Sequence, residues 1–332
     1  MSHSSAARLC VHDACDEEDS GALMATSRSN SQPRFRRWMR RSAFALLLVG
    51  LCAMGAICWS ASERAIHPQI HGYKWSLANY PDLVNHQDVH FKTQDGVVLA
   101  GRVFPGVNAG LILLSHGYGD TQEQVLPIAH FLHEAGFWVF SYDMRSRGHS
   151  GGYAVSLGAL EQADLISAVD FLRQKPLTQR EKIGAWGISL GGATSILAAA
   201  RDQRIAAVVD DSGFSDAPNV ISTAFEHFIH LPSFPFAPLT VWISHERVGA
   251  DINGVRPMDA VSRISPRPVF LIHCLGDNLV PPDNTERNFA RAAEPKQVWY
   301  IPGGGHALGH TVRRAEYEQR VVEFFDRWLL AR

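Results

Sequence analysis

The sequence predicts one large α/β domain built on a mostly parallel, doubly wound sheet. From Asp88 onward, short apolar runs alternate with helical stretches, which is the order of strands and helices in such a sheet. Most of these runs are continuously apolar rather than alternating, as expected for parallel strands covered on both faces. With 332 residues, 46% of them hydrophobic, the chain is long enough to bury a large core.

The individual elements follow from the positions of these runs. The segments DVHFKT and VVLAGRVF flank Gln94-Asp95-Gly96, a turn signal that predicts an antiparallel hairpin at the start of the sheet. Further strands are expected at LILLS, WVFSYD, KIGAW, AAVVDD, PVFLIHC and QVWYIP, with helices at about 122–135, 158–174, 190–201, 284–293 and 312–330. Catalytic loops should therefore lie at the carboxyl ends of the strands.

One strand-to-helix junction carries a serine between two glycines. In KIGAWGISLGGATSILAAA, Ser189 follows Gly187 by two residues and precedes Gly191 by two. A turn this sharp strains its central residue, and side chains at the flanking positions would collide with the facing strand or helix. The turn exposes the hydroxyl above the sheet, beside the free N–H groups of a helix N-terminus. We therefore interpret Ser189 as a nucleophile.

A serine nucleophile needs a base and an acid that orients the base. His306 lies in YIPGGGHALGH, directly after the last expected strand, where three glycines allow close approach to the sheet. His310 is its nearest rival. Asp277 follows the preceding strand in LIHCLGDNLVPP, whereas its rival Asp283 lies beyond Pro281-Pro282 and should open a helix. The chain order serine, aspartate, histidine fits a nucleophile on such a turn.

Two N–H groups should stabilise the oxyanion that forms during acyl transfer. The backbone of Leu190, directly after the nucleophile, is the first candidate. The second is the backbone of Tyr118, in the HGYG segment that follows the strand LILLS. His116, in the same segment, is expected to brace the loop rather than to act as a base.

A segment of about 213–258 interrupts the alternation of strands and helices. Its content of Phe and Pro is too high for a regular strand or a long helix, so we expect an irregular lid over the strand ends. We predict that four aromatic residues of this lid line an apolar substrate channel: Phe228, Phe234, Phe236 and Trp242. The alternative is a proline-rich excursion that only packs on the domain.

The N-terminal part predicts a membrane anchor. Five arginines precede the uncharged run Ala43–Trp59, which at about 17 residues is just long enough to span a bilayer. We expect residues 1–41 to be a disordered cytoplasmic tail, 42–60 a transmembrane signal anchor and 61–87 a linker. The domain would occupy 88–332, on the far side of the membrane. A cleaved signal peptide is the alternative, since small residues follow Trp59, and Met24 or Met39 is an alternative start.

Residues 88–330 resemble the α/β-hydrolase superfamily of serine hydrolases. The segments HGYGD, DMRSRGHSGG, GISLGG, GDNLVPP and GGGHALGH occur in that family's order and spacing. The resemblance implies a Ser189, Asp277 and His306 triad. VRPMDAVSRISPRPVFLIH further resembles a bacterial group of dienelactone-hydrolase-like and serine aminopeptidase-like proteins, most of them esterases by assignment. In a bacterium, the expected anchor and its arginines would place the protein in the inner membrane with a periplasmic domain, or the domain would be secreted if the segment is cleaved. Serine at the turn departs from the cysteine of dienelactone hydrolases and disfavours their reaction.

The expected activity is hydrolysis of carboxylic esters, with apolar small-molecule or lipid-like esters as substrates. A serine peptidase or aminopeptidase, or a thioesterase, is the alternative on the same fold. We expect no cofactor and no metal, because His306 and His310 lie in a glycine-containing segment that disfavours the helix needed to align them, and no H-E-x-x-H motif occurs. A formal net charge of −2 gives no basis for nucleic-acid binding, and the oligomeric state is left open.

Overall fold

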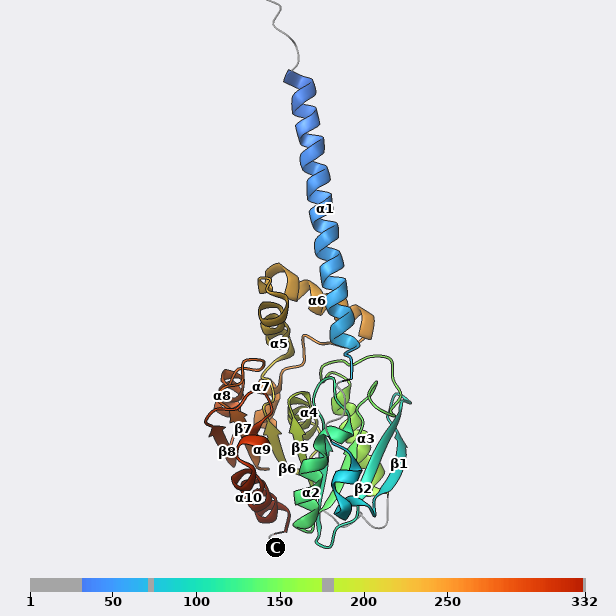
Figure 1. The fold of residues 1–332 in the computed structure, drawn as a ribbon, viewed down its shortest axis with the longest axis vertical. Helices are drawn as coiled ribbons and strands as arrows, with labels where there is room; N and C mark the ends of the chain where they lie inside the picture. The colour runs from blue at the N-terminus through green and yellow to red at the C-terminus, as the bar shows by residue number, and fades with distance from the viewer. Residues whose placement is uncertain (1–31, 71–74, 175–181, 331–332) are drawn as a thin grey trace, which may run out of the picture. The chain divides into compact units, whose positions relative to one another are not determined.

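The computed structural model describes residues 32–70, 75–174 and 182–330, which contain the expected eight-stranded sheet (Figure 1). Its strand order is β1-β2-β4-β3-β5-β6-β7-β8. The strands are β1 Gln87–Lys92, β2 Val98–Phe104, β3 Gly110–Ser115, β4 Trp138–Tyr142, β5 Lys182–Ile188, β6 Ile205–Asp211, β7 Val269–Cys274 and β8 Lys296–Ile301. All eight coincide with the runs from which the sequence predicts strands.

The pairing makes this a mostly parallel sheet. β1 and β2 form the expected antiparallel hairpin, and β2 also runs antiparallel to β4. From β4 to β8 every neighbouring pair is parallel. The carboxyl ends of these strands therefore share one edge of the sheet, which is where ligands bind in open α/β folds.

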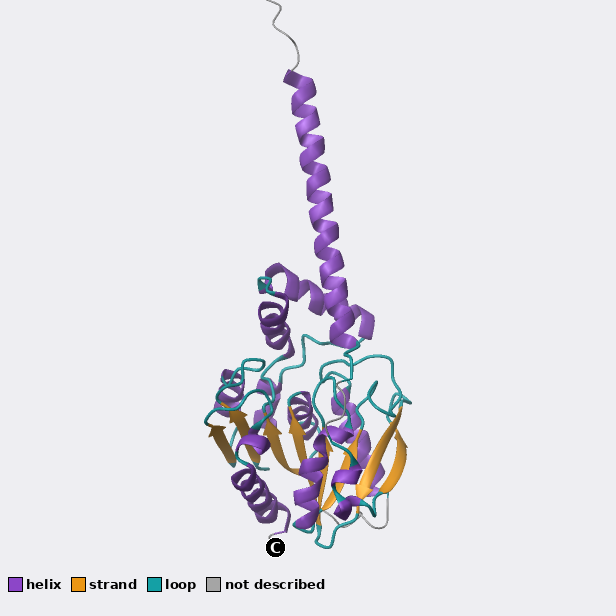
Figure 2. Ribbon diagram, in the orientation of Figure 1, coloured by secondary structure: helices purple, strands orange, loops and turns teal. Residues whose placement is uncertain are grey.

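Helices cover both faces of the sheet (Figure 2). They are α2 Leu126–Glu134, α3 Glu161–Arg173, α4 Leu190–Ala199, α8 Asp283–Arg291 and α10 Arg314–Phe325, with the shorter η1 Leu77–Asn79, η2 Pro81–Leu83, η3 Gln122–Val125, α7 Pro257–Ala260, η5 Val261–Ile264, α9 Gly309–Val312 and η6 Asp326–Leu330. Two separate apolar cores result. Along β3, Leu111 and Leu113 belong to the core that includes α3 and α4, whereas Ile112 and Leu114 belong to the core that includes α2 and α10. Burial on both faces explains the continuously apolar run.

The insertion between β6 and β7 is helical, which corrects the expectation of an irregular lid. It contains α5 Ala217–Ala224, the π-helical turn η4 Phe225–Ile229 and α6 Ser233–Val248. The prolines do not prevent α6, because Phe234 is non-helical and the regular part begins after it. Pro238 then lies near the first turn, where most amide groups have no partner within the helix.

The N-terminal helix α1 runs from Gln32 to Ile66. It extends beyond the predicted anchor at both ends, so residues 32–41 and 61–66 are helical rather than tail and linker; arginine is a good helix former. Residues 1–31 lie outside the described part. The chain divides into two compact units, Met1–Leu51 and Cys52–Arg332, and α1 belongs to both.

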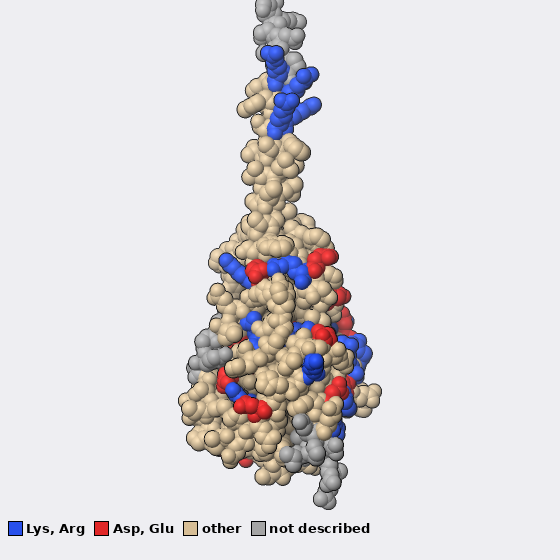
Figure 3. Space-filling view, turned by 90° about the vertical axis from the view of Figure 1, so that its right-hand side faces the viewer, with Lys and Arg blue, Asp and Glu red and all other residues tan. Residues whose placement is uncertain are grey.

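Within the described residues, one helix is long and apolar enough to cross a membrane, Arg34–Ile66. Figure 3 shows basic side chains gathered near the start of α1 and no charged side chain on the visible face of the stretch that follows. A signal sequence would have the same length and composition. The finding is thus compatible with both expectations for this segment.

A buried ion pair holds the segment after β4 against α3. Arg145 Nε donates a hydrogen bond to Asp164 Oδ2 at 2.7 Å, and the Asp164 side chain is fully buried. Arg145 also contacts the half-exposed Asp95 in the β1–β2 turn, at 3.0 Å. Burial raises the pKa of Asp164 to about 7, against the hydrogen bond and charge of Arg145, which lower it.

We expect Asp164→Ala to lower the free energy of unfolding by about 3 kcal/mol. The reason is that the buried guanidinium of Arg145 would keep only Asp95, its half-exposed partner. Urea unfolding of the detergent-solubilised protein, followed by circular dichroism, measures the change. Asp170→Ala is the control, since its ion pair with Arg204 is about 40% exposed on both sides and should contribute less than about 1 kcal/mol. Equal losses in the two variants would contradict this account.

Candidate active site

Ser189 occupies a strained turn between β5 and α4. Its φ of 55° and ψ of −117° are unfavourable for a residue with a side chain, and its amide donates to Asp211 O at 2.8 Å. A Cβ atom on Gly187 would overlap Gly191 O, and one on Gly191 would overlap Ser115 O. The two glycines therefore let β5, α4 and the end of β3 approach one another around the serine.

The structure brings Ser189, His306 and Asp277 into one hydrogen-bonded chain. His306 Nε2 lies 2.8 Å from Ser189 Oγ, and His306 Nδ1 lies 2.7 Å from Asp277 Oδ2. The three residues follow β5, β7 and β8, whose carboxyl ends share one edge of the sheet. Gly303 and Gly304 both have positive φ in the loop that carries His306 back over this edge. This arrangement could transfer a proton from the hydroxyl to the imidazole.

Asp277 is held as a carboxylate. Its Oδ1 accepts hydrogen bonds from the amides of Leu279 and Val280, both at 2.9 Å. Burial tends to raise the pKa of Asp277, but hydrogen bonds from His273 and His306 outweigh it and hold the pKa well below its ordinary value. A permanently ionised partner is what a histidine needs if it is to become protonated during a reaction.

His273 is a second histidine on Asp277 that sequence reasoning missed. It lies on β7 with its side chain fully buried, and its Nε2 is 3.3 Å from Asp277 Oδ2 and 2.8 Å from Val280 O. Its Nδ1 lies 2.7 Å from Thr285 Oγ1 on α8. The available signal was a histidine inside the otherwise apolar run PVFLIHC. Because it contacts Asp277 rather than Ser189, His273 would act as a positioning residue if Asp277 orients the base.

The two rivals considered for the base and the acid lie elsewhere. His310 Nε2 contacts Glu318 Oε1 at 2.9 Å, and its ring stacks on Phe131. Asp283 is the first residue of α8 and pairs with Arg287 one turn along. In the described part of the chain, the hydrogen bonds of the Ser189 and His306 side chains involve neither of these two rivals.

The loop after β3 lies against the serine. A Cβ atom on Gly117 would be 3.6 Å from Ser189 Cβ, and the Gly117 amide donates to Gln124 Oε1 at 2.6 Å. Leu190 is the first residue of α4, so its N–H has no partner within that helix. Leu190 and Tyr118 therefore flank the serine on two elements, which is compatible with an oxyanion site. Their role stays a prediction.

Two further side chains fix this loop. His116 is fully buried; its Nδ1 contacts Gly117 O at 2.8 Å and its Nε2 accepts from the Met144 amide at 2.9 Å. Burial lowers its pKa, so the ring is neutral and bridges two loops. The Tyr118 hydroxyl donates to Arg64 O at 2.6 Å, in the last turn of α1. No sequence signal pointed to this second contact.

The four lid aromatics do not surround one enclosed channel in this structure. Three of them are largely exposed: Phe228 by 61%, Phe234 by 78% and Trp242 by 56%. Phe236 is half-buried, and its ring stacks on the buried Phe225 with centroids 6.2 Å apart. Only Phe236 therefore packs inward, and the channel itself stays a prediction.

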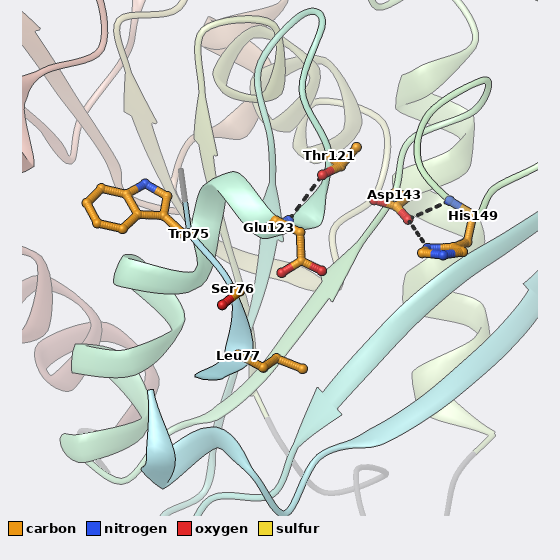
Figure 4. Close-up of a pocket in the computed structure, with 7 residues that line it drawn as sticks. All are labelled: Trp75, Ser76, Leu77, Thr121, Glu123, Asp143 and His149. Atoms are coloured by element: carbon orange, nitrogen blue, oxygen red, sulfur yellow. Dashed lines mark hydrogen bonds and ion pairs between the residues drawn. The ribbon is translucent and has the colours of Figure 1, made fainter. Parts of the chain in front are cut away.

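A separate hollow lies near the start of η3 (Figure 4). It is lined by Trp75, Ser76, Leu77, Thr121, Glu123, Asp143 and His149. Asp143 is committed to structural hydrogen bonds there, accepting from the amides of Gln122 at 2.8 Å and His149 at 2.9 Å. None of the predicted site residues lines the hollow, so we do not assign the chemistry to it. Among the described residues, no group of three or more His, Cys, Asp and Glu side chains could hold a metal ion.

Comparison with known families shows which family the chain belongs to. Residues 124–332 match the model of the prolyl oligopeptidase family, which covers more than half of the chain. The chain belongs to this family. The protein YqkD of Bacillus subtilis is 30% identical over 226 residues, which are 68% of this chain and 73% of that protein. The thiohydrolase aneE of Aspergillus aculeatus is 36% identical over a shorter segment, 37% of this chain and 40% of that protein.

Solved structures agree on the fold. The esterase Pf2001 of Pyrococcus furiosus superposes with a TM-score of 0.65 at 24% identity, covering 79% of this chain and 98% of that one. The α/β-hydrolase GrgF of Penicillium gives a TM-score of 0.62 at 23% identity, covering 75% and 100%. Together with the family match, these likenesses confirm the α/β-hydrolase fold and a serine hydrolase of that superfamily.

We expect His273→Gln to destabilise the protein more at pH 5.5 than at pH 8.5. Burial lowers the pKa of His273, but Asp277, Val280 O and the charge of Asp210 outweigh it and raise the pKa above 6.5. A raised pKa contributes stability below the unfolded value and loses it as the pH rises through the folded value. Urea unfolding of both proteins at the two pH values measures this difference. A loss that is larger at pH 8.5 would contradict it.

Proposed function

We propose that this serine hydrolase cleaves carboxylic esters through an acyl-enzyme, with Ser189 as nucleophile, His306 as general base and acid, and Asp277 as the orienting carboxylate. The observation that carries the proposal is the continuous hydrogen-bonded chain from Ser189 Oγ through His306 to Asp277, at the strained turn. Asp277 would stabilise the imidazolium without accepting its proton.

The reaction would proceed in two steps. Ser189 Oγ attacks the ester carbonyl while its proton moves to His306 Nε2, and the backbone amides of Leu190 and Tyr118 bind the oxyanion. The tetrahedral intermediate expels the alcohol, which takes the proton from His306. Water then attacks the acyl-enzyme with His306 as base, which releases the acid and restores Ser189.

An ester substrate is favoured over a peptide by the extent of the likenesses. The alignment with this chain covers 98% of the length of the esterase Pf2001. The acylaminoacyl peptidase of Pyrococcus horikoshii is covered over only 41% of its length, at a TM-score of 0.54. The family description and the thiohydrolase aneE keep peptides and thioesters as alternatives. Rates on p-nitrophenyl esters, acyl thioesters and peptide anilides distinguish the three.

We also propose that α1 anchors the enzyme in the bacterial inner membrane with the catalytic domain on the periplasmic side. The uncharged stretch from Ser42 to Ser62 and the arginines before it support a span with a cytoplasmic N-terminus. Retention with membranes after a carbonate wash supports the anchor. Release with a new N-terminus near Ala61 indicates a cleaved signal peptide instead.

Ser189→Ala should reduce ester hydrolysis on the order of a million-fold while leaving the fold intact, because no other group can form the acyl-enzyme. Turnover of p-nitrophenyl butyrate and labelling by a fluorophosphonate measure the loss. Ser195→Ala, in the helix that follows Ser189, is a matched control, since its buried hydroxyl donates to Gly191 O within that helix. Undiminished labelling of the Ser189 variant would remove the nucleophile assignment.

Phe236 provides the test of apolar specificity. Burying each additional methylene against an apolar wall contributes roughly 0.8 kcal/mol, so two carbons should raise kcat/KM about tenfold from acetate to butyrate. Phe236→Ala should flatten that profile because it removes the lid ring that packs inward. Phe289→Ala, a half-buried ring on α8, is the control. An unchanged profile in the Phe236 variant would make this part of the lid structural only.

A further inference from the structure

The exposed part of the lid forms an uncharged aromatic surface, here called the lid surface. It consists of Phe228, Phe234, Pro238 and Trp242, all exposed. No Asp, Glu, Lys or Arg occurs from His227 to His245. Isolated exposed rings are common in proteins, but several together without intervening charge mark an interaction site.

The geometry of α6 explains why Pro238 and Trp242 stay outside. Ala237, Val241 and Ser244 are buried and define the face of α6 that packs on the protein. Pro238 and Trp242, one turn apart, lie on the opposite face. Glu246 is one turn further on that face and is the first charged residue there, so the uncharged stripe ends at this turn.

α6 packs mainly on α5 and also makes side-chain contacts with the second half of α1. Cys58 Sγ contacts Phe236 O at 3.5 Å, and Ser244 Oγ donates to Ser62 Oγ at 2.9 Å. Near its C-terminus, α6 places Arg247 over the Trp59 ring, 4.5 Å from the centroid, and pairs it with Glu63. These contacts on α1 fall within one and a half turns, from Cys58 to Glu63, and Figure 1 shows α6 beside this lower part of α1.

That level of α1 is where a membrane span would leave the hydrocarbon. The uncharged stretch begins after Arg41 and ends before Glu63. A helix needs about 20 residues at 1.5 Å each to cross a core of roughly 30 Å. A span that starts after Arg41 therefore ends near Ala61. Trp59, by its type, suits the interface between hydrocarbon and water.

We propose that the lid surface lies in the interfacial layer of the membrane that α1 enters, and that the enzyme takes ester amphiphiles from that bilayer. The proposal rests on the proposed esterase function and anchor. Its occupant is lipid rather than a second protein, because the lid is fixed to α1 at the level of the interface. Phe and Trp rings without neighbouring charges are the residues that insert at this depth.

The first experiment compares esters in the bilayer and in water. Full-length protein is reconstituted in phosphatidylcholine vesicles, and turnover of a long-chain fluorogenic ester in the vesicles is divided by turnover of p-nitrophenyl acetate. A variant carrying Phe228→Ser, Phe234→Ser and Trp242→Ser should lower this ratio by about tenfold, because the lid no longer inserts where the ester resides. Val107→Ser is the control at an exposed position before β3, away from the lid, and should keep the ratio. An unchanged ratio in the triple variant would overturn the proposal.

The second experiment needs no activity. The chain has eight tryptophans, so the emission of Trp242 is obtained by subtracting the spectrum of Trp242→Phe from that of the parent protein. We expect this component to be quenched in vesicles of acyl-chain-brominated phosphatidylcholine. If neither ester is hydrolysed while quenching persists, the proposed function fails and the membrane contact stands. If the component is unquenched, the lid surface faces water or a protein, and the proposal is wrong.

Discussion

The strained backbone of Ser189 is the constraint on which the rest of the site depends. Its positive φ is held by a hydrogen bond from its own amide N–H to Asp211 O and by the close approach of Gly187 and Gly191 to their neighbours. Such strain persists only where the surrounding structure over-determines it. Here the turn is fixed between parallel strands. The carboxyl ends of these strands also bring the loops of His306 and Asp277 to the same edge of the sheet, next to Ser189.

The fold and the residues of the candidate triad could be predicted from the sequence because each has a local signal. Continuously apolar runs marked the strands, and Ser189 stood between glycines at a strand-to-helix junction. His273 was missed although Asp277 follows it by four residues, because a single polar residue inside an apolar strand has no distinctive pattern around it. The contact of the Tyr118 hydroxyl could not be predicted, because its partner Arg64 lies 54 residues earlier on another element. The helical character of the lid was missed for a different reason: its prolines lie before α6 or, like Pro238, near the first turn of its regular part, where proline is tolerated.

The fold is shared with the solved structures, whereas the lid aromatics must be interpreted from this chain alone. Structures with TM-scores of 0.65 and 0.62 confirm the fold. Their sequence identities of 24% and 23% are too low to assign their substrates to this chain. Substrate choice must therefore be argued from this chain's own residues. Among the four lid aromatics, burial divides Phe236, which packs inward, from the three that face outward. One short segment could thus both shape an acyl site and contact the surroundings of the substrate.

The last turn of α1 is bonded to the catalytic domain through its carbonyl groups. Arg64 O accepts from Tyr118, Ile66 O from the Val155 amide, and Pro68 O, just beyond the helix, from Arg147. All three acceptors lie after Ala61, so a signal peptidase cutting there would leave every one of them on the mature protein. Processing would then change where the enzyme resides without dismantling the loop beside Ser189. A soluble form prepared for crystallisation should begin no later than Arg64, because a later start removes the carbonyl that accepts the 2.6 Å hydrogen bond from the Tyr118 hydroxyl.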